Sequence, residues 1–175
     1  MNRKLEIGSG KKPQPGYEHL DFRSDLPHID HVHDLTTPLP FSANTFDEVY
    51  ADQVLEHFPW IKSLSTLKDW VRVLKPAGKL HIIVPDFEYI IQGYINNTGQ
   101  SNISKKRKSH AINGMGAWNS KTCTIIKLFG GQDYSGNFHY AAFDSELIVV
   151  LFKTIGLKKI KTVAKNGRLT AIGIK

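Results

Sequence analysis

Cysteine and long apolar runs are both scarce in this chain of 175 residues. Cys123 is its single cysteine, so the chain has neither a disulfide framework nor a cysteine metal cluster. Apolar stretches such as residues 147–152 are far shorter than the about 20 residues that cross a bilayer. The first residues, MNRK, lead straight into an apolar strand pattern and do not resemble a signal peptide. These features predict a cytoplasmic protein without a membrane span.

Acidic residues are also in deficit, with 16 Asp and Glu against 23 Lys and Arg and a formal net charge of +7. Much of the excess lies in residues 105–108 (KKRK) and 158–161. Runs of this kind are most often solvated loops. If they have a role in recognition, they favour an anionic acceptor, such as the phosphates of a nucleotide-sugar or a phosphorylated glycan.

Apolar stretches bounded by turn residues alternate with helical spacing along the chain. Strands are predicted at residues 5–7, 19–22, 31–33, 45–50, 79–84, 160–163 and 169–174. Helices are predicted at residues 64–74 and, after an Asp144 N-cap, at 145–155. This order is typical of a doubly wound α/β fold with a mostly parallel sheet covered on both faces. Asn166-Gly167 predicts a hairpin that adds an antiparallel C-terminal strand.

The length fits one domain, residues 1–175. Within it we interpret residues 87–140 as an insertion on the acceptor side. Residues 96–116 are rich in Asn, Ser, Gly and Lys and are expected to form a long loop. Loops of that length inside compact domains are usually functional or mobile.

A glycine turn, Gly8-x-Gly10, follows the first strand. A dinucleotide site would need a third glycine and a helix that begins at the pyrophosphate. Here Pro13 and Pro15 leave little room for a regular helix, which argues against a nicotinamide-dependent enzyme.

Acidic residues lie where a nucleoside ligand would need them. Asp21 ends the second strand, where a carboxylate can accept both ribose hydroxyls. Asp34 follows the third strand and is placed to receive an adenine amino group, while Leu35 packs on the ring. Glu6 precedes the glycine turn and is placed to hold either the amino group of the ligand or the loop itself. For each acid the alternative is a strand-end solvation residue or a helix cap.

An ordered set of motifs runs through the first half of the chain. It comprises LEIGSG (5–10), HLD (19–21), HDL with PLPF (33–41), FDEVY with VLEH (46–57) and VLKPAGKL (73–80). The set resembles class I S-adenosylmethionine-dependent methyltransferases. FGGQ (129–132) with His139 resembles a subgroup of small methyltransferases associated with surface-polysaccharide synthesis. The resemblance implies a seven-stranded Rossmann-like sheet with an antiparallel last strand. It also implies S-adenosyl-L-methionine contacts at Glu6, Gly8, Gly10, Asp21, Asp34, Leu35, Gln53 and Val54.

Candidate catalytic residues follow the fourth strand and the insertion. Glu56 and His57 come at the edge of the sheet where ligands bind in open α/β folds, and His57 is a candidate base. His139 is the second candidate, with Tyr134, Phe138 and Tyr140 lining an acceptor site around it. The alternatives are that Glu56 and His57 orient a short helix, and that the aromatic residues form core under a loop.

No metal is expected from the sequence. Glu56 and His57 are two adjacent ligands, which are too few, and His28, His31 and His33 have poor spacing for a metal site.

Together these features predict a methyltransferase that acts on a small molecule or glycan, at oxygen. A nucleic-acid methyltransferase is the first alternative. Against it, the basic run has no aromatic residue nearer than Trp118, residues 51–54 (ADQV) do not resemble an Asn-Pro-Pro-Tyr motif, and no proline precedes Cys123. A non-catalytic module that binds an adenosyl ligand is the second alternative.

Overall fold

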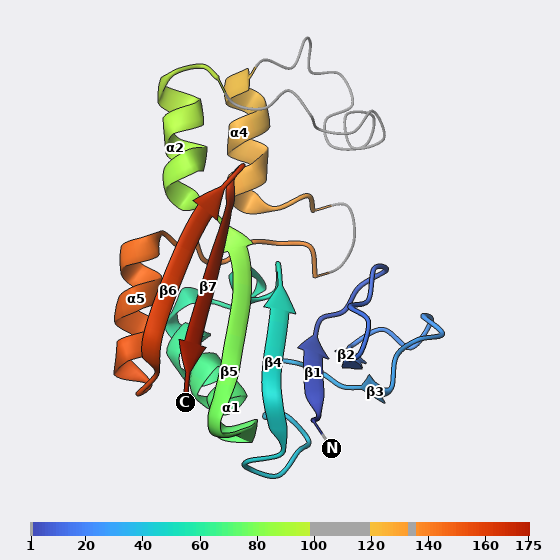
Figure 1. Cartoon of the computed structure of the whole chain (residues 1–175). Coiled ribbons are helices and arrows are strands. Elements are labelled where there is room, and N and C mark those ends of the chain that lie inside the picture. The colour runs from blue at the N-terminus through green and yellow to red at the C-terminus, as the bar shows by residue number, and fades with distance from the viewer. Residues whose placement is uncertain (1, 99–119, 133–135) are drawn as a thin grey trace.

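The chain forms one seven-stranded sheet beside a set of helices (Figure 1). The structure is a computed structural model that describes residues 2–98, 120–132 and 136–175. The strands are β1 (Lys4–Ile7), β2 (Glu18–Asp21), β3 (His31–Val32), β4 (Phe46–Asp52), β5 (Leu74–Pro85), β6 (Lys158–Lys165) and β7 (Arg168–Ile174). Their order across the sheet is β3-β2-β1-β4-β5-β7-β6.

The pairing confirms the predicted topology. β3, β2, β1, β4 and β5 run parallel to one another, whereas β7 is antiparallel to both β5 and β6. The predicted turn at Asn166-Gly167 joins β6 to β7, with φ values of 53° and 76°. Two positive φ values are what a type I′ hairpin turn requires, and Asn and Gly tolerate them.

The described helices all follow β4 in the chain. They are α1 (Ser63–Val73), α2 (Phe87–Ile95), α4 (Ser120–Phe129) and α5 (Ser145–Thr154), with short 3-10 turns η1 (Leu55–His57) and η2 (Trp60–Lys62). α5 begins as predicted, because the Asp144 carboxylate accepts a hydrogen bond from the Leu147 amide at 2.8 Å. In the described parts of the chain, no helix has the length and apolar character that a membrane span would need.

α2 and α4 were not predicted. They pack against each other beyond the carboxyl ends of the strands (Figure 1) and belong to the segment 87–140 that we interpreted as an insertion. Residues 99–116 of the expected long loop, including the basic run 105–108, lie outside the described residues.

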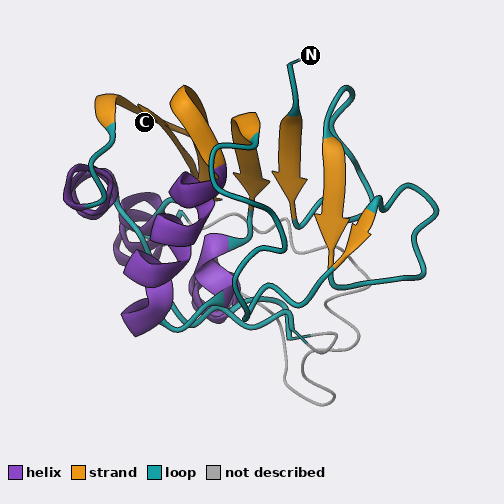
Figure 2. Ribbon diagram, turned by 90° about the horizontal axis from the view of Figure 1, so that it is seen from below, coloured by secondary structure: helices purple, strands orange, loops and turns teal. Residues whose placement is uncertain are grey.

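Helices were expected on both faces of the sheet, but the described helices cover only one of them. α1 packs on β4 and β5, and α5 packs on β6 and β7, with the helices on one side of the sheet (Figure 2). On the other face, Tyr17 of the loop after β1 packs against Tyr50, with ring centroids 5.9 Å apart. A proline-containing loop therefore stands where a first helix would lie, because Pro13 and Pro15 prevent a regular helix there.

The main core lies between the sheet and the helices. Its central side chains are at most 2% exposed and come from Leu5, Ile7, Val49, Leu80, Ile82, Leu67, Trp70, Ile148 and Phe152. Burial of such a side chain contributes roughly 1.5–3 kcal/mol. This core fixes the strands whose carboxyl ends carry the candidate site.

Candidate active site

The turn after β1 depends on its first glycine for two reasons. Gly8 has a φ of +66° and Gly10 a φ of +59°, and residues other than glycine rarely adopt such values. A Cβ atom on Gly8 would also lie 2.6 Å from Cγ2 of Val54. The Gly8 amide donates to the Leu20 carbonyl at 2.7 Å, which bends the chain back over β2. The glycine therefore lets the β1 turn lie directly against the residues that follow β4.

Asp21 lies at the end of β2 and is 3% exposed. One of its carboxylate oxygens accepts a hydrogen bond from the Gly10 amide at 3.0 Å. The other accepts the Arg23 amide at 3.0 Å and contacts Arg23 Nε at 3.4 Å. A carboxylate has about four acceptor positions, so Asp21 retains capacity for the ribose hydroxyls that it was predicted to bind.

Asp34 and Leu35 follow β3 on the far side of the same opening. One carboxylate oxygen of Asp34 accepts the Thr36 amide at 2.9 Å and the Thr36 hydroxyl at 2.8 Å. These hydrogen bonds, first that of the amide, lower the pKa of the Asp34 carboxyl. Asp34 is therefore a carboxylate at neutral pH and can accept a hydrogen bond from an amino group.

Glu6 was expected to hold either the amino group of the ligand or the loop, and its hydrogen bonds are with the loop and β2. Its buried carboxylate accepts the Gln14 amide at 2.8 Å and lies 2.9 Å from Nδ1 of His19. Burial raises the pKa of the Glu6 carboxyl. Glu6 is absent from the lining of the cavity described next, so it ties the proline-containing loop to β2.

A cavity of about 640 Å³ opens where these strands end. Its lining includes seven of the residues predicted to contact the cofactor: Gly8, Gly10, Asp21, Asp34, Leu35, Gln53 and Val54. The volume falls within the roughly 300–1,000 Å³ of small-molecule sites. Gln53 has a φ of 57°, and its buried amide nitrogen has no hydrogen-bond partner among the described residues. A strained residue with an orphaned donor at a cavity wall is typical of a ligand-binding position.

Eight of the sixteen lining residues were not predicted as site residues from the sequence, and four of them lie near the ends of β2 and β3. Phe22, Arg23, Val32 and His33 complete the wall between Asp21 and Asp34. Phe22 is 53% exposed and Val32 57%, although both are apolar. An apolar residue directly after a ligand-binding acid was the available signal for Phe22, and β3 is too short for its pattern to orient Val32.

Comparison with known proteins finds similarity to methyltransferases over part of the sequence. Residues 8–82 match the family model described as "Methyltransferase domain". An uncharacterised protein of Methanocaldococcus jannaschii is 41% identical over 59 residues, which cover 34% of this chain. The aligned segment spans a quarter (25%) of the length of that relative.

Solved methyltransferases share the fold at low sequence identity. A SAM-dependent methyltransferase from Archaeoglobus fulgidus has a TM-score of 0.60 at 11% identity, over 99% of this chain and 86% of that one. An O-methyltransferase family protein from Burkholderia thailandensis has a TM-score of 0.61 at 11% identity, over 99% and 51% of the two chains. The fold is that of the class I methyltransferases. The matched residues 8–82 are similar to a methyltransferase domain, and the cofactor that this similarity implies is S-adenosylmethionine.

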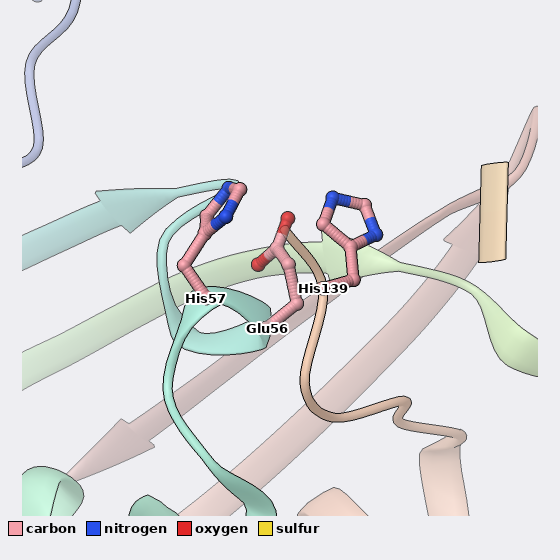
Figure 3. Close-up of side chains that lie close together, drawn as sticks. All are labelled: Glu56, His57 and His139. Atoms are coloured by element: carbon pink, nitrogen blue, oxygen red, sulfur yellow. The ribbon is translucent and has the colours of Figure 1, made fainter. Parts of the chain in front are cut away.

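The three candidate catalytic residues lie together (Figure 3). Glu56 and His57 lie on the η1 turn after β4, and His139 comes from the chain that returns from α4. The rings of His57 and His139 are edge to face, with centroids 5.0 Å apart. Of the three, His57 also lines the cavity of about 640 Å³, so the cluster adjoins that cavity through His57.

Backbone hydrogen bonds hold the returning chain against η1. The Tyr140 amide donates to the Glu56 carbonyl at 2.8 Å, and His57 Nδ1 lies 2.9 Å from the Phe138 carbonyl oxygen. The His139 amide donates to the Phe129 carbonyl at 3.1 Å. A Cβ atom on Gly130, whose φ is +82°, would lie 2.7 Å from the Asn137 carbonyl oxygen and 3.0 Å from the His139 ring. Gly130, which belongs to the FGGQ motif (129–132), therefore permits the close approach that places His139.

Burial sets the protonation of this cluster. Glu56 is 0% exposed, and its removal from water raises the pKa of its carboxyl to about 8. Burial also lowers the pKa of His57. Because a carbonyl oxygen can only accept, His57 Nδ1 carries the hydrogen, and Nε2 keeps its lone pair. Phe138 and Tyr140 flank His139 and are 37% and 57% exposed, while Tyr134 lies outside the described residues.

Proposed function

We propose that this domain transfers a methyl group to an oxygen of a small-molecule or glycan acceptor. The observation that carries the proposal is the cluster of Glu56, His57 and His139, which adjoins the cavity through His57. The cofactor supplies an electrophilic methyl group when it is bound. A neutral hydroxyl is a weak nucleophile, so an oxygen acceptor is the class for which a proton acceptor at the cavity matters most.

His57 is the residue that we assign to the acceptor proton. Its Nδ1–H is directed to the Phe138 carbonyl, which leaves the Nε2 lone pair to accept. His139 packs edge to face against this imidazole, and a Glu56 carboxylate oxygen lies within 4.8 Å of both rings. Alignment of acceptor oxygen and methyl carbon supplies the larger part of the rate, roughly 7–11 kcal/mol, and proton removal adds about 10²–10⁴-fold.

A carbohydrate acceptor is favoured by the aromatic residues beside the cluster. The rings of Phe138 and Tyr140 lie 6.2 Å apart, tilted by 31°, and both are partly exposed. Exposed aromatic rings offer apolar faces to the C–H faces of sugar rings. The sequence resemblance to the surface-polysaccharide subgroup makes nucleotide-sugars and cytoplasmic glycan precursors the first acceptors to test.

The test is an assay for S-adenosylhomocysteine release with nucleotide-sugars, free oligosaccharides and single-stranded oligonucleotides as acceptors. We expect turnover with a sugar hydroxyl, and a fall of about 10²-fold or more in His57→Ala with cofactor affinity retained. Turnover of the oligonucleotides alone would move the function to nucleic acid. Cofactor binding without turnover of any acceptor would favour a binding module.

A further inference from the structure

The cluster beside the cavity has the composition of a metal site. One ligand atom each from Glu56, His57 and His139 lies within 4.8 Å of the others. Figure 3 shows the Glu56 carboxylate between the two imidazole rings. Two imidazoles and one carboxylate form a set that binds first-row transition metals and leaves coordination positions open.

Glu56 gives an independent reason to place a cation there. The residue is fully buried, and neither carboxylate oxygen has a hydrogen-bond partner among the described residues. A buried carboxylate is costly unless it is paired, hydrogen-bonded or bound to a metal. The nearby guanidinium of Arg168 is engaged elsewhere, because its Nη2 lies 2.6 and 2.7 Å from the two oxygens of Asp52.

His57 is already oriented as a metal ligand. Metal-bound histidines usually donate their second ring N–H to a carbonyl or carboxylate, which fixes the tautomer and the ring. His57 Nδ1 does so to the Phe138 carbonyl at 2.9 Å, which makes Nε2 the ring nitrogen with the lone pair that a metal needs. That carbonyl belongs to the residue before His139, so one hydrogen bond orients the first imidazole and anchors the chain that carries the second.

The spacing requires a small adjustment. Two ligands about 2.1 Å from one ion lie at most about 4.2 Å apart. The largest separation in the cluster, 4.8 Å, is slightly greater. The difference of about 0.6 Å is the adjustment that side-chain rotation about the χ angles would have to supply on metal binding.

We propose that Glu56, His57 and His139 bind one divalent transition-metal ion, of the Zn²⁺ type, beside the cofactor cavity. The sequence alone offered two adjacent ligands, and the fold adds the third from 82 positions further along the chain (139 − 57). Zinc with two histidines and one carboxylate keeps a fourth position for a water or substrate oxygen.

The role of the ion rests on the proposed function. Coordination of an acceptor hydroxyl lowers its pKa, so that the O–H bond breaks and its proton passes to solvent. The oxygen–carbon bond then forms as the carbon–sulfur bond of the cofactor breaks, which leaves S-adenosylhomocysteine as a neutral thioether. With the ion bound, His57 Nε2 is a metal ligand, so this scheme keeps the proposed oxygen acceptor but replaces the assignment of His57 as the base.

Metal binding is tested on the whole chain without cofactor or acceptor. After treatment with a chelator and its removal, the protein is titrated with Zn²⁺ by calorimetry and with Co²⁺ by visible absorption. We expect one ion per chain with a Kd below about 0.1 mM, and at least tenfold weaker binding in Glu56→Gln and in His139→Ala. His31→Ala is the matched control, because His31 lies outside the cluster, with its Nε2 3.1 Å from a carboxylate oxygen of Glu18. It should bind the ion as the natural chain does.

Two results would overturn the site: the absence of stoichiometric binding, or equal binding by all four proteins. Circular dichroism checks that each variant is folded. If the ligand variants do not fold, proton NMR of the Co²⁺-loaded natural chain decides, since two histidine ligands give two shifted exchangeable N–H signals and an adventitious ion gives none. Stoichiometric binding without turnover of any acceptor would remove the proposed function and leave the metal site intact.

Discussion

Replacement of Asp21 separates a ligand-binding role from a loop-holding role. In Asp21→Ala, the amides of Gly10 and Arg23 each lose an acceptor at 3.0 Å. Leaving such donors unpaired costs about 1–3 kcal/mol each when they are buried, and less where water from the cavity replaces the carboxylate. A hydrogen bond to a charged group contributes about 1.5–3 kcal/mol, so loss of one ribose contact alone predicts at least a tenfold rise in the cofactor Kd, about 1.4 kcal/mol.

Asp21→Asn distinguishes the two roles. The amide keeps the size of the side chain and one oxygen that can accept from Gly10, but it removes the charge. Calorimetric titration with S-adenosylmethionine and S-adenosylhomocysteine, together with thermal unfolding, measures both effects. We expect Asp21→Ala to lose affinity and stability, and Asp21→Asn to lose mainly affinity. Unchanged affinity in a folded Asp21→Ala protein would remove Asp21 from the ribose site.

Three further changes test other features. Gly8→Ala should lower the free energy of unfolding, measured with urea, by more than Gly16→Ala does. Both glycines have positive φ, but only an alanine methyl at position 8 would meet Val54, at 2.6 Å. Equal effects would refute the contact. Asp144→Ala should cost about 1 kcal/mol through loss of the α5 cap, and Asp144→Asn much less, in the same assay. Hydrogen bonding by Arg3 lowers the pKa of Glu18. The pair therefore stabilises the fold at pH values above the ordinary glutamate pKa. This contribution disappears as the pH falls through the lowered pKa. The stability difference between the natural chain and Glu18→Gln, about 0.2–1 kcal/mol at pH 7, should therefore shrink toward pH 3; a constant difference would contradict it.

Local signals were sufficient for most of the sheet. Gly and Pro bracketed the predicted core of β5, and Asn166-Gly167 carries its turn geometry in two residues. β5 nevertheless begins five residues earlier than predicted, at Leu74 (79 − 74), because pairing of Leu74 with Phe46 of β4 extends the strand past Pro76. That pairing depends on residues remote in sequence, which local propensity does not register.

The candidate site divides in the same way. Residues at strand ends, such as Gly8 and Asp21, were predictable because parallel strands bring their carboxyl ends to one edge. The meeting of His139 with Glu56 was not, since it depends on the return of the chain from α4 and on the close packing that Gly130 allows. The helices α2 and α4 were not predicted. They lie on either side of residues 96–116, and the polar composition of that stretch led to the prediction of a loop for the segment.

The contact between Gly8 and Val54 has a consequence for the thermodynamics of binding. Because the turn after β1 touches the chain after β4, neither loop can shift without the other, and the Gly10–Asp21 hydrogen bond ties the same turn to β2. Three strand ends thus hold the floor of the cavity in one arrangement before a ligand arrives. Little conformational entropy is left to lose in that floor, so affinity there is set by the contacts that the ligand makes and not by the ordering of the loops that make them.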